Sequence, residues 1–150
     1  MTLKAQLQDD LTTAMKARDT VRLATIRMAL TAVTNEEVAG KQSRELTDDD
    51  VLKVLARELK KRKEAATAFS EAGKDDRAQA ELAEAAVLEE YLPAQLSDDE
   101  LVALVTAAVA ESGATNPQGM GAVMKIVQPK IAGRADGSRV AAEVKRQLAT

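Results

Sequence analysis

Phosphate binding is the chemistry that the residue types of this chain leave open, and the basic side chains near the C-terminus are its best candidates. Residues 117–150 contain six basic and two acidic residues. The basic residues flank a turn with two glycines and the helix start that follows it: Lys125, Lys130, Arg134, Arg139, Lys145 and Arg146. Backbone N–H groups there, with flanking arginine and lysine, can hold a phosphate of an RNA backbone. A helix-turn-helix with solvated charges is the alternative, and composition alone favours it.

A second basic group crowds within two turns of a predicted helix: Arg57, Lys60, Lys61, Arg62 and Lys63. Lys60, Lys61 and Lys63 cannot all face one way, so a solvated helix face is the favoured interpretation. The sequence contains no GxGxxG motif after a strand and no P-loop. With one Phe, one Tyr and no Trp, it also offers few platforms for stacking bases, so RNA recognition would depend on shape and backbone.

Other chemistries find little support in the sequence. Zero His removes the commonest general base, and zero Cys removes thiolate nucleophiles, disulfides and Cys-ligated zinc. The serines fall in predicted loops, caps or helix ends, where a structural role is favoured: Ser43, Ser70, Ser97, Ser112 and Ser138. The acidic runs 48–50 and 98–100 lack the loop glycine of a calcium site and suit helix starts. We therefore expect no catalytic residue, no metal and no cofactor.

Glu89 and Glu90, beside Tyr91, are the remaining acid–base candidates. Adjacent positions of a helix point about 100° apart. The sequence therefore predicts that Glu89 and Glu90 do not converge on one site.

The elements that position these residues are helices, because the apolar spacing is helical almost everywhere and no stretch alternates with period two. The first stripe is Leu3, Leu7, Leu11 and Met15, and the second is Leu23, Ile26, Leu30 and Val33. We expect Asp19 to cap the second helix and Gly40 to end it as a C′ glycine. Thr47 is predicted to cap a third helix that Gly73 closes, and a fourth runs from about Asp75 to Leu92, before Pro93.

The last third has its own start and stop signals. Ser97 with Glu100 predicts a capping box for a helix over 101–111 that stops at Gly113. Asn116-Pro117 starts the next helix, whose apolar positions are Met120, Val123, Met124, Val127 and Ile131. The turn Gly133–Gly137 leads to a helix capped by Asp136 or Ser138, with a stripe of Val140, Val144 and Leu148. The expected domains are 1–95 and 96–150.

Charge and hydropathy limit which partners and which cellular compartment can be expected. The chain has 150 residues and a net charge of -3, which argues against binding nucleic acid with the whole surface, and no DNA partner is expected. Residues 75–100 carry nine acidic residues against Arg77 alone. Residues 1–18 contain no apolar signal-peptide or membrane segment, so we expect a cytoplasmic protein without membrane contact.

Several motifs together resemble the GatB/YqeY family. They are Tyr91-Leu92-Pro93-Ala94-Gln95-Leu96-Ser97 with Glu100-Leu101, Met120-Gly121-x-Val123-Met124-Lys125, and Pro129-Lys130-x-x-Gly133-Arg134-Ala135-Asp136-Gly137. The run Arg57 to Ala66 is similar to free-standing YqeY-type members, so the resemblance covers nearly the whole chain. Gln128 departs from the pattern, which usually has an apolar residue there, often Met.

The resemblance implies an all-α fold in which a helical N-terminal domain packs against a small three-helix C-terminal domain. That C-terminal domain is similar to the tail of the GatB component of aspartyl/glutamyl-tRNA amidotransferase, which touches tRNA. The separate amidase component and the large body of GatB are missing here, so a label of carbon–nitrogen ligase with glutamine as amido-N-donor is inherited from the family. An RNA-facing patch is carried over onto matching positions: Lys125, Lys130, Arg134 and Arg139, with Gly121, Gly133 and Gly137 permitting close backbone approach.

Three hypotheses follow. The leading one is a noncatalytic tRNA-binding accessory protein. The second is a protein-interaction adaptor whose acidic stretch docks a basic partner, such as an amidotransferase subunit or another protein. The third is a component of an amidotransferase, whose presence would alter transamidation by the purified subunits.

Overall fold

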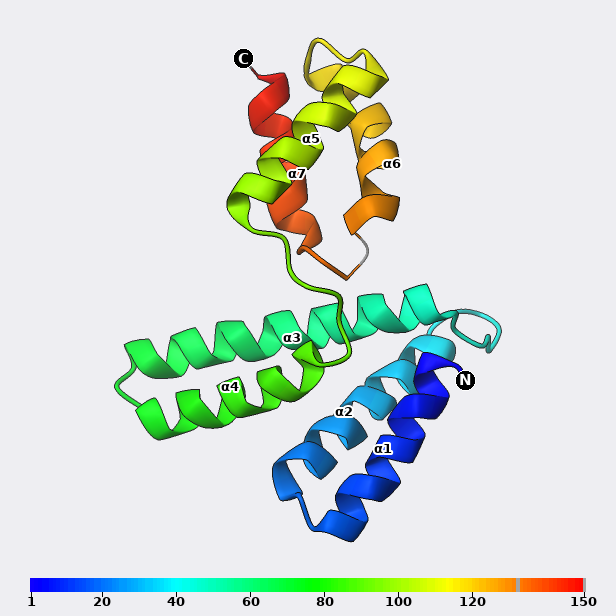
Figure 1. The fold of residues 1–150 in the computed structure, drawn as a ribbon, viewed down its shortest axis with the longest axis vertical. Helices are drawn as coiled ribbons and strands as arrows, with labels where there is room; N and C mark the ends of the chain where they lie inside the picture. Colours follow the sequence, from blue (N-terminus) through cyan, green and yellow to red (C-terminus); the bar gives the residue numbers. More distant parts are fainter. Residues whose placement is uncertain (132, 150) are drawn as a thin grey trace. The chain divides into compact units, whose positions relative to one another are not determined.

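The structure is a computed structural model that describes residues 1–131 and 133–149, and within these residues it contains helices and no strand (Figure 1). The predicted all-α fold is confirmed. The chain divides into two compact units, Met1–Pro93 and Ala94–Thr150, each with its own hydrophobic core. This division falls two residues before the expected one, because Gln95 and Leu96 hydrogen-bond to the carbonyls of Gly133 and Arg134.

Four helices form the N-terminal unit as two hairpins: α1 (Leu3–Ala17) with α2 (Thr20–Glu37), and α3 (Asp48–Glu71) with α4 (Asp75–Glu89) (Figure 1). The predicted stripes supply its core, since Leu7, Ile26 and Val33 are fully buried. Met15 was expected in the first stripe but is 49% exposed, and Ala14 is buried in its place. Near the end of α1 the buried face therefore includes Ala14 in place of Met15.

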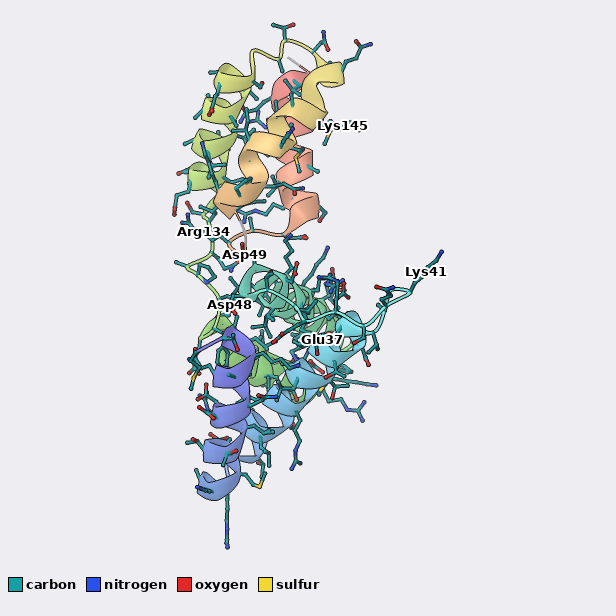
Figure 2. All side chains as sticks on the ribbon, turned by 90° about the vertical axis from the view of Figure 1, so that its right-hand side faces the viewer. Glu37, Lys41, Asp48, Asp49, Arg134 and Lys145 are labelled. Carbon is teal, nitrogen blue, oxygen red and sulfur yellow. The ribbon has the colours of Figure 1, made fainter. Side chains whose placement is uncertain are left out.

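Helix α3 begins with a complete capping box. The Thr47 hydroxyl accepts the backbone N–H of Asp50, and the Asp50 carboxylate accepts the backbone N–H of Thr47. Asp48 and Asp49 also lie in this first turn, where the helix dipole favours negative charge (Figure 2). Gly73, with φ 75°, lies just past the other end of α3, as predicted.

Gly40 does not end α2, contrary to the prediction. The helix stops at Glu37 with Val38 as its C-cap. The backbone N–H of Arg44 donates to the Glu37 carbonyl at 2.9 Å, which satisfies one of the last free acceptors of the helix. A loop contact therefore replaces the glycine cap.

Replacing Thr47 with alanine should lower the free energy of unfolding by about 1 kcal/mol, because it leaves the Asp50 N–H without its acceptor. Urea unfolding followed by circular dichroism measures this loss. Thr67→Ala is the matched control, since Thr67 is an exposed residue inside α3 whose hydroxyl only donates back to the Lys63 carbonyl. Equal losses in the two variants would contradict a capping role for Thr47.

The basic group of α3 is not the solvated face that was predicted, because Arg62 is buried with 4% exposure. Its Nη1 donates to Glu58 Oε2 at 2.9 Å, and its Nε lies 3.3 Å from Glu84 Oε2 without hydrogen-bond geometry. Arg57 and Lys63 reach carboxylates of other helices, Glu36 and Glu89. The group consequently ties α3 to its neighbours.

The C-terminal unit contains α5 (Asp98–Ser112), a short 3-10 turn (Pro117–Gly119), α6 (Met120–Ile131) and α7 (Gly137–Leu148), and all three helices pack on one another. Val123, Val127, Val140 and Val144 are fully buried in its core, as their spacing predicted. Helix α6 continues for two residues past Pro129, which lies in its last turn.

The ends of α5 match their predicted signals in part. The Ser97 hydroxyl accepts the Glu100 N–H at 3.1 Å, while the Glu100 carboxylate lies 3.8 Å from Arg134 instead of completing a capping box. Gly113 follows α5 in the left-handed conformation, with φ 73°. Helix α5 is therefore closed at both ends by the residues expected from the sequence.

Candidate functional site

The turn between α6 and α7 is built around Gly133, which is buried and has φ 70°, a conformation that favours glycine. Its carbonyl accepts the side-chain amide of Gln95 at 2.8 Å. Asp136 then caps α7 by accepting the Ser138 N–H, as predicted. The requirement for glycine at 133 is thus explained by the backbone of the turn itself.

The two candidate arginines bind the segment that precedes α5. Arg134 Nε donates to the Ala94 carbonyl at 3.1 Å, and the Leu96 N–H donates to the Arg134 carbonyl at 2.8 Å. Arg139 donates to the Leu96 carbonyl at 3.0 Å and to the Asp98 carboxylate at 2.7 Å. We call this set of bonds, between residues 94–98 and residues 133, 134 and 139, the clasp. Each arginine side chain retains 35% exposure.

The candidate lysines are exposed instead. Lys130 lies 3.7 Å from Glu111 with both side chains more than half exposed, a pairing that contributes little. Lys125 on α6 is exposed, and the part of the chain that is described offers it no carboxylate or carbonyl partner. The structure therefore separates the patch into two arginines held inside the unit and two lysines that face solvent.

Lys145, one of the basic residues that the sequence placed around this turn but not in the patch carried over from the family, joins the exposed cations. It lies on α7, next to buried Val144, and within residues 133–149 and 1–131 no partner is recorded for it (Figure 2). Its position one residue after a core valine was the signal available in the sequence. By contrast, neighbouring Arg146 hydrogen-bonds Glu143, which lowers the pKa of that carboxyl to about 2.

The remaining candidate glycines have open surroundings. A Cβ at Gly121 or Gly137 would meet no atom within 4 Å, and neither residue has a positive φ. A close approach to another backbone does exist at Gly119, where a Cβ would stand 2.4 Å from the Ala114 Cβ. The sequence did not predict this role for Gly119, because its neighbour Ala114 lies before Pro117, outside the helix that was predicted to contain Gly119.

Serine hydroxyls in this unit have structural partners, in agreement with the capping interpretation. Ser97 caps α5, and Ser112 accepts the Ala114 N–H while donating to the Val109 carbonyl. The Ser138 hydroxyl donates to Asp136. Among the described residues, no group of three or more His, Cys, Asp or Glu side chains could hold a metal ion. Exposed lysines such as those of this unit are side chains that can bind anions.

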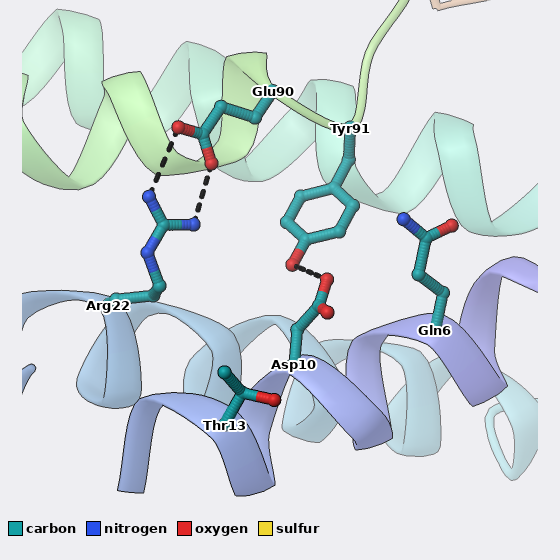
Figure 3. A pocket seen from close by; sticks show the side chains of 6 residues that line it. All are labelled: Gln6, Asp10, Thr13, Arg22, Glu90 and Tyr91. Atoms are coloured by element: carbon teal, nitrogen blue, oxygen red, sulfur yellow. Dashed lines mark hydrogen bonds and ion pairs between the residues drawn. The ribbon is translucent and has the colours of Figure 1, made fainter. Parts of the chain in front are cut away.

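Glu89 and Glu90 do not converge, as predicted: Glu89 pairs with Lys63 of α3, and of these two described residues only Glu90 lines a pocket. Helix α4 ends at Glu89 with Glu90 as its C-cap, and the Tyr91 N–H donates to the Leu88 carbonyl in the turn that follows. Glu90 pairs with Arg22 of α2, and the Tyr91 hydroxyl donates to Asp10 of α1 (Figure 3). Both side chains line one pocket of the N-terminal unit.

Comparison with known proteins places these features in a family. Its model, described as Yqey-like protein, matches residues 4–148. An uncharacterized protein of Schizosaccharomyces pombe is 34% identical over 97 residues, which cover 64% of this chain and 76% of that protein. Altered inheritance of mitochondria protein 41, mitochondrial, of Clavispora lusitaniae is 29% identical over 133 residues, which cover 87% of this chain and 76% of that protein.

The protein of the same name from Meyerozyma guilliermondii is 33% identical over 86 residues, 57% of this chain and 44% of that protein. Of the helices in the described residues, none has the length and apolar character needed to cross a membrane. The family match extends over both units and all their helices, including the motifs around Pro93, Gly121 and Gly133. The chain belongs to the family of Yqey-like proteins.

Proposed function

We propose that this protein is a noncatalytic RNA-binding accessory protein of the cytoplasm, whose C-terminal unit contacts the phosphate backbone of tRNA. The observation that carries the proposal is the exposure of Lys125, Lys130 and Lys145, of which two have no internal partner in the described residues. Flexible lysine side chains free of carboxylates are suited to phosphate contacts that fix position without reading sequence.

The arginines of the clasp serve this function by holding the turn in shape. Their guanidinium groups already donate to two main-chain carbonyls and lie next to Asp98 and Glu100. A phosphate that reached them would have to displace these carboxylates. We therefore assign the direct contacts to the lysines, and to Arg134 and Arg139 the placement of α7 and its N-terminus.

The test is fluorescence anisotropy of labelled tRNA titrated with the protein at several salt concentrations. We expect the Lys125→Gln, Lys130→Gln, Lys145→Gln variant to bind at least about tenfold more weakly at low salt. Each lost phosphate contact should also reduce the slope of log K against log salt by about 0.7–0.9. Lysines are the better test positions, because substitutions of the clasp arginines would also disturb the fold.

A matched control removes the same charge from the other unit. Lys16, Lys41 and Lys53 are exposed, and Figure 2 shows Lys41 on the loop after α2, extending away from the helices. Their triple change to Gln should leave tRNA binding nearly unaltered. Equal weakening by both triple variants would mean that net charge alone determines binding. Absence of saturable binding by the intact protein would refute the proposal in favour of a protein-interaction adaptor.

A further inference from the structure

A pocket of about 310 Å³ lies on the N-terminal unit, and neither the proposed RNA contacts nor the clasp involves it. Its walls come from α1, α2 and the residues after α4 (Figure 3): Gln6, Asp10, Thr13, Arg22, Glu90 and Tyr91. Gln6, Asp10 and Thr13 follow each other at helical spacing on one face of α1. The volume is at the lower end of the range of small-molecule sites.

The cationic group of the pocket is already neutralised. Arg22 donates to both carboxylate oxygens of Glu90, at 2.6 and 3.1 Å, and its Nε lies 3.6 Å from Asp19. The hydrogen bond between Arg22 and Glu90 raises the pKa of the Arg22 guanidinium and lowers the pKa of the Glu90 carboxyl. Arg22 is therefore poorly placed to recruit an anionic ligand.

The anionic group on the floor is not neutralised. Asp10 Oδ2 accepts the Tyr91 hydroxyl at 2.5 Å, and the described chain provides Asp10 with no cationic partner. Burial and this hydrogen bond raise the pKa of the Tyr91 phenol, so it stays a neutral donor. Asp10 lies between Gln6 and Thr13 along the pocket face of α1, and the Tyr91 ring forms the adjoining wall (Figure 3).

These features together select the charge of the ligand. Two carboxylates and one guanidinium line the pocket, so its net charge is negative and is centred on Asp10. Oxygen acceptors on one face of α1 can receive N–H donors, and an aromatic face attracts an adjacent cation. We propose that this pocket binds a small organic cation with a primary ammonium group, held by Asp10 and Gln6 against the Tyr91 ring.

The chain supplies its own probe for the test. Tyr91 is the single tyrosine and there is no tryptophan, so intrinsic fluorescence reports on the pocket alone. We would titrate the protein with cadaverine, and with two five-carbon molecules of other charge, glutarate and 1,5-pentanediol. Saturable change with cadaverine and none with the other two is expected. No saturable change with cadaverine, or an equal or stronger response to either of the others, would overturn the proposal.

Substitutions locate the binding group. Asp10→Asn should weaken cadaverine binding at least about tenfold, whereas Asp9→Asn, the same change at the adjacent exposed position outside the pocket, should have little effect. Because Asp10→Asn also alters the environment of Tyr91, NMR shifts of the Gln6 side-chain amide provide a second readout. Gln6→Ala, which breaks no recorded side-chain bond, should weaken binding severalfold. Equal weakening by the Asp9 and Asp10 variants would contradict the site.

An alkylammonium group can come from a free amine or from a lysine side chain. A capped Gly-Lys-Gly peptide, titrated in the same way, separates these sources. Tighter binding of cadaverine identifies a free amine, and tighter binding of the peptide identifies a lysine. Both results require that cadaverine binds, so its failure refutes the site whatever the peptide does, and it leaves the tRNA experiment unaffected.

Discussion

Arg62→Ala should destabilise the N-terminal unit by about 3–5 kcal/mol, because it leaves two carboxylates without their buried cation. The Glu58 side chain is 13% exposed and that of Glu84 is 27% exposed, so water screens them only in part. Arg62 also joins three helices, through Glu58 on α3, Glu84 on α4 and the Met28 sulfur on α2. Urea unfolding followed by Tyr91 fluorescence measures the loss in this unit.

Two further variants separate charge from packing. Arg57→Ala removes an exposed arginine of the same helix, paired with Glu36, and should cost less than about 1 kcal/mol. Arg62→Met combined with Glu58→Gln and Glu84→Gln removes the whole charge group and should restore most of the stability. If Arg62→Ala cost no more than Arg57→Ala, the buried ion group would not hold these helices together.

Leu101→Ala should unfold the C-terminal unit or bring it close to unfolding. Leu101 is 3% exposed, and its removal to alanine costs about 2–5 kcal/mol. A core in a unit this small supplies only about 3–5 kcal/mol of net stability. Native-state hydrogen exchange, resolved by residue, should show loss of protection in α5, α6 and α7 while α1 to α4 keep theirs.

The adjacent residue provides the control. Val102 is 36% exposed, and Val102→Ala should change stability by no more than about 0.5 kcal/mol. All the core neighbours of Leu101 belong to the C-terminal unit. Loss of protection that spread equally into α1–α4 would show that the two cores unfold as one.

Local signals in the sequence predicted most of the fold. The spacing of Leu7 and Val33 in one unit and of Val140 in the other identifies the buried faces, and the structure confirms them. Thr47 caps its helix because the hydroxyl and the N–H that it satisfies are three residues apart. Such interactions join residues that are close in the sequence, so they can be predicted without knowledge of the tertiary structure.

Several contacts that the sequence did not predict join distant residues. The prediction of a solvated face for Arg62 missed its carboxylate partner on α4, Glu84, which lies 22 positions away along the chain. Tyr91 and Asp10 are separated by 81 positions, and Arg134 and Ala94 by 40. Composition shows that opposite charges are present, but only the packing of helices decides which of them come together. The sequence therefore identified the basic residues around the turn but not which of them are held by internal hydrogen bonds and which are exposed.

The clasp has a consequence for how this unit can be inherited. Its hydrogen bonds lie entirely within the C-terminal unit, between the strip 94–98 and the turn before α7. A gene fragment that begins after Pro93 would thus encode a unit that includes all the hydrogen bonds of the clasp, which hold its N-terminal residues in place. Such a unit can be fused to the C-terminus of an unrelated protein without new contacts at the junction, since the upstream protein need only provide an accessible chain end. This suitability for fusion depends on the clasp and is independent of what the unit binds.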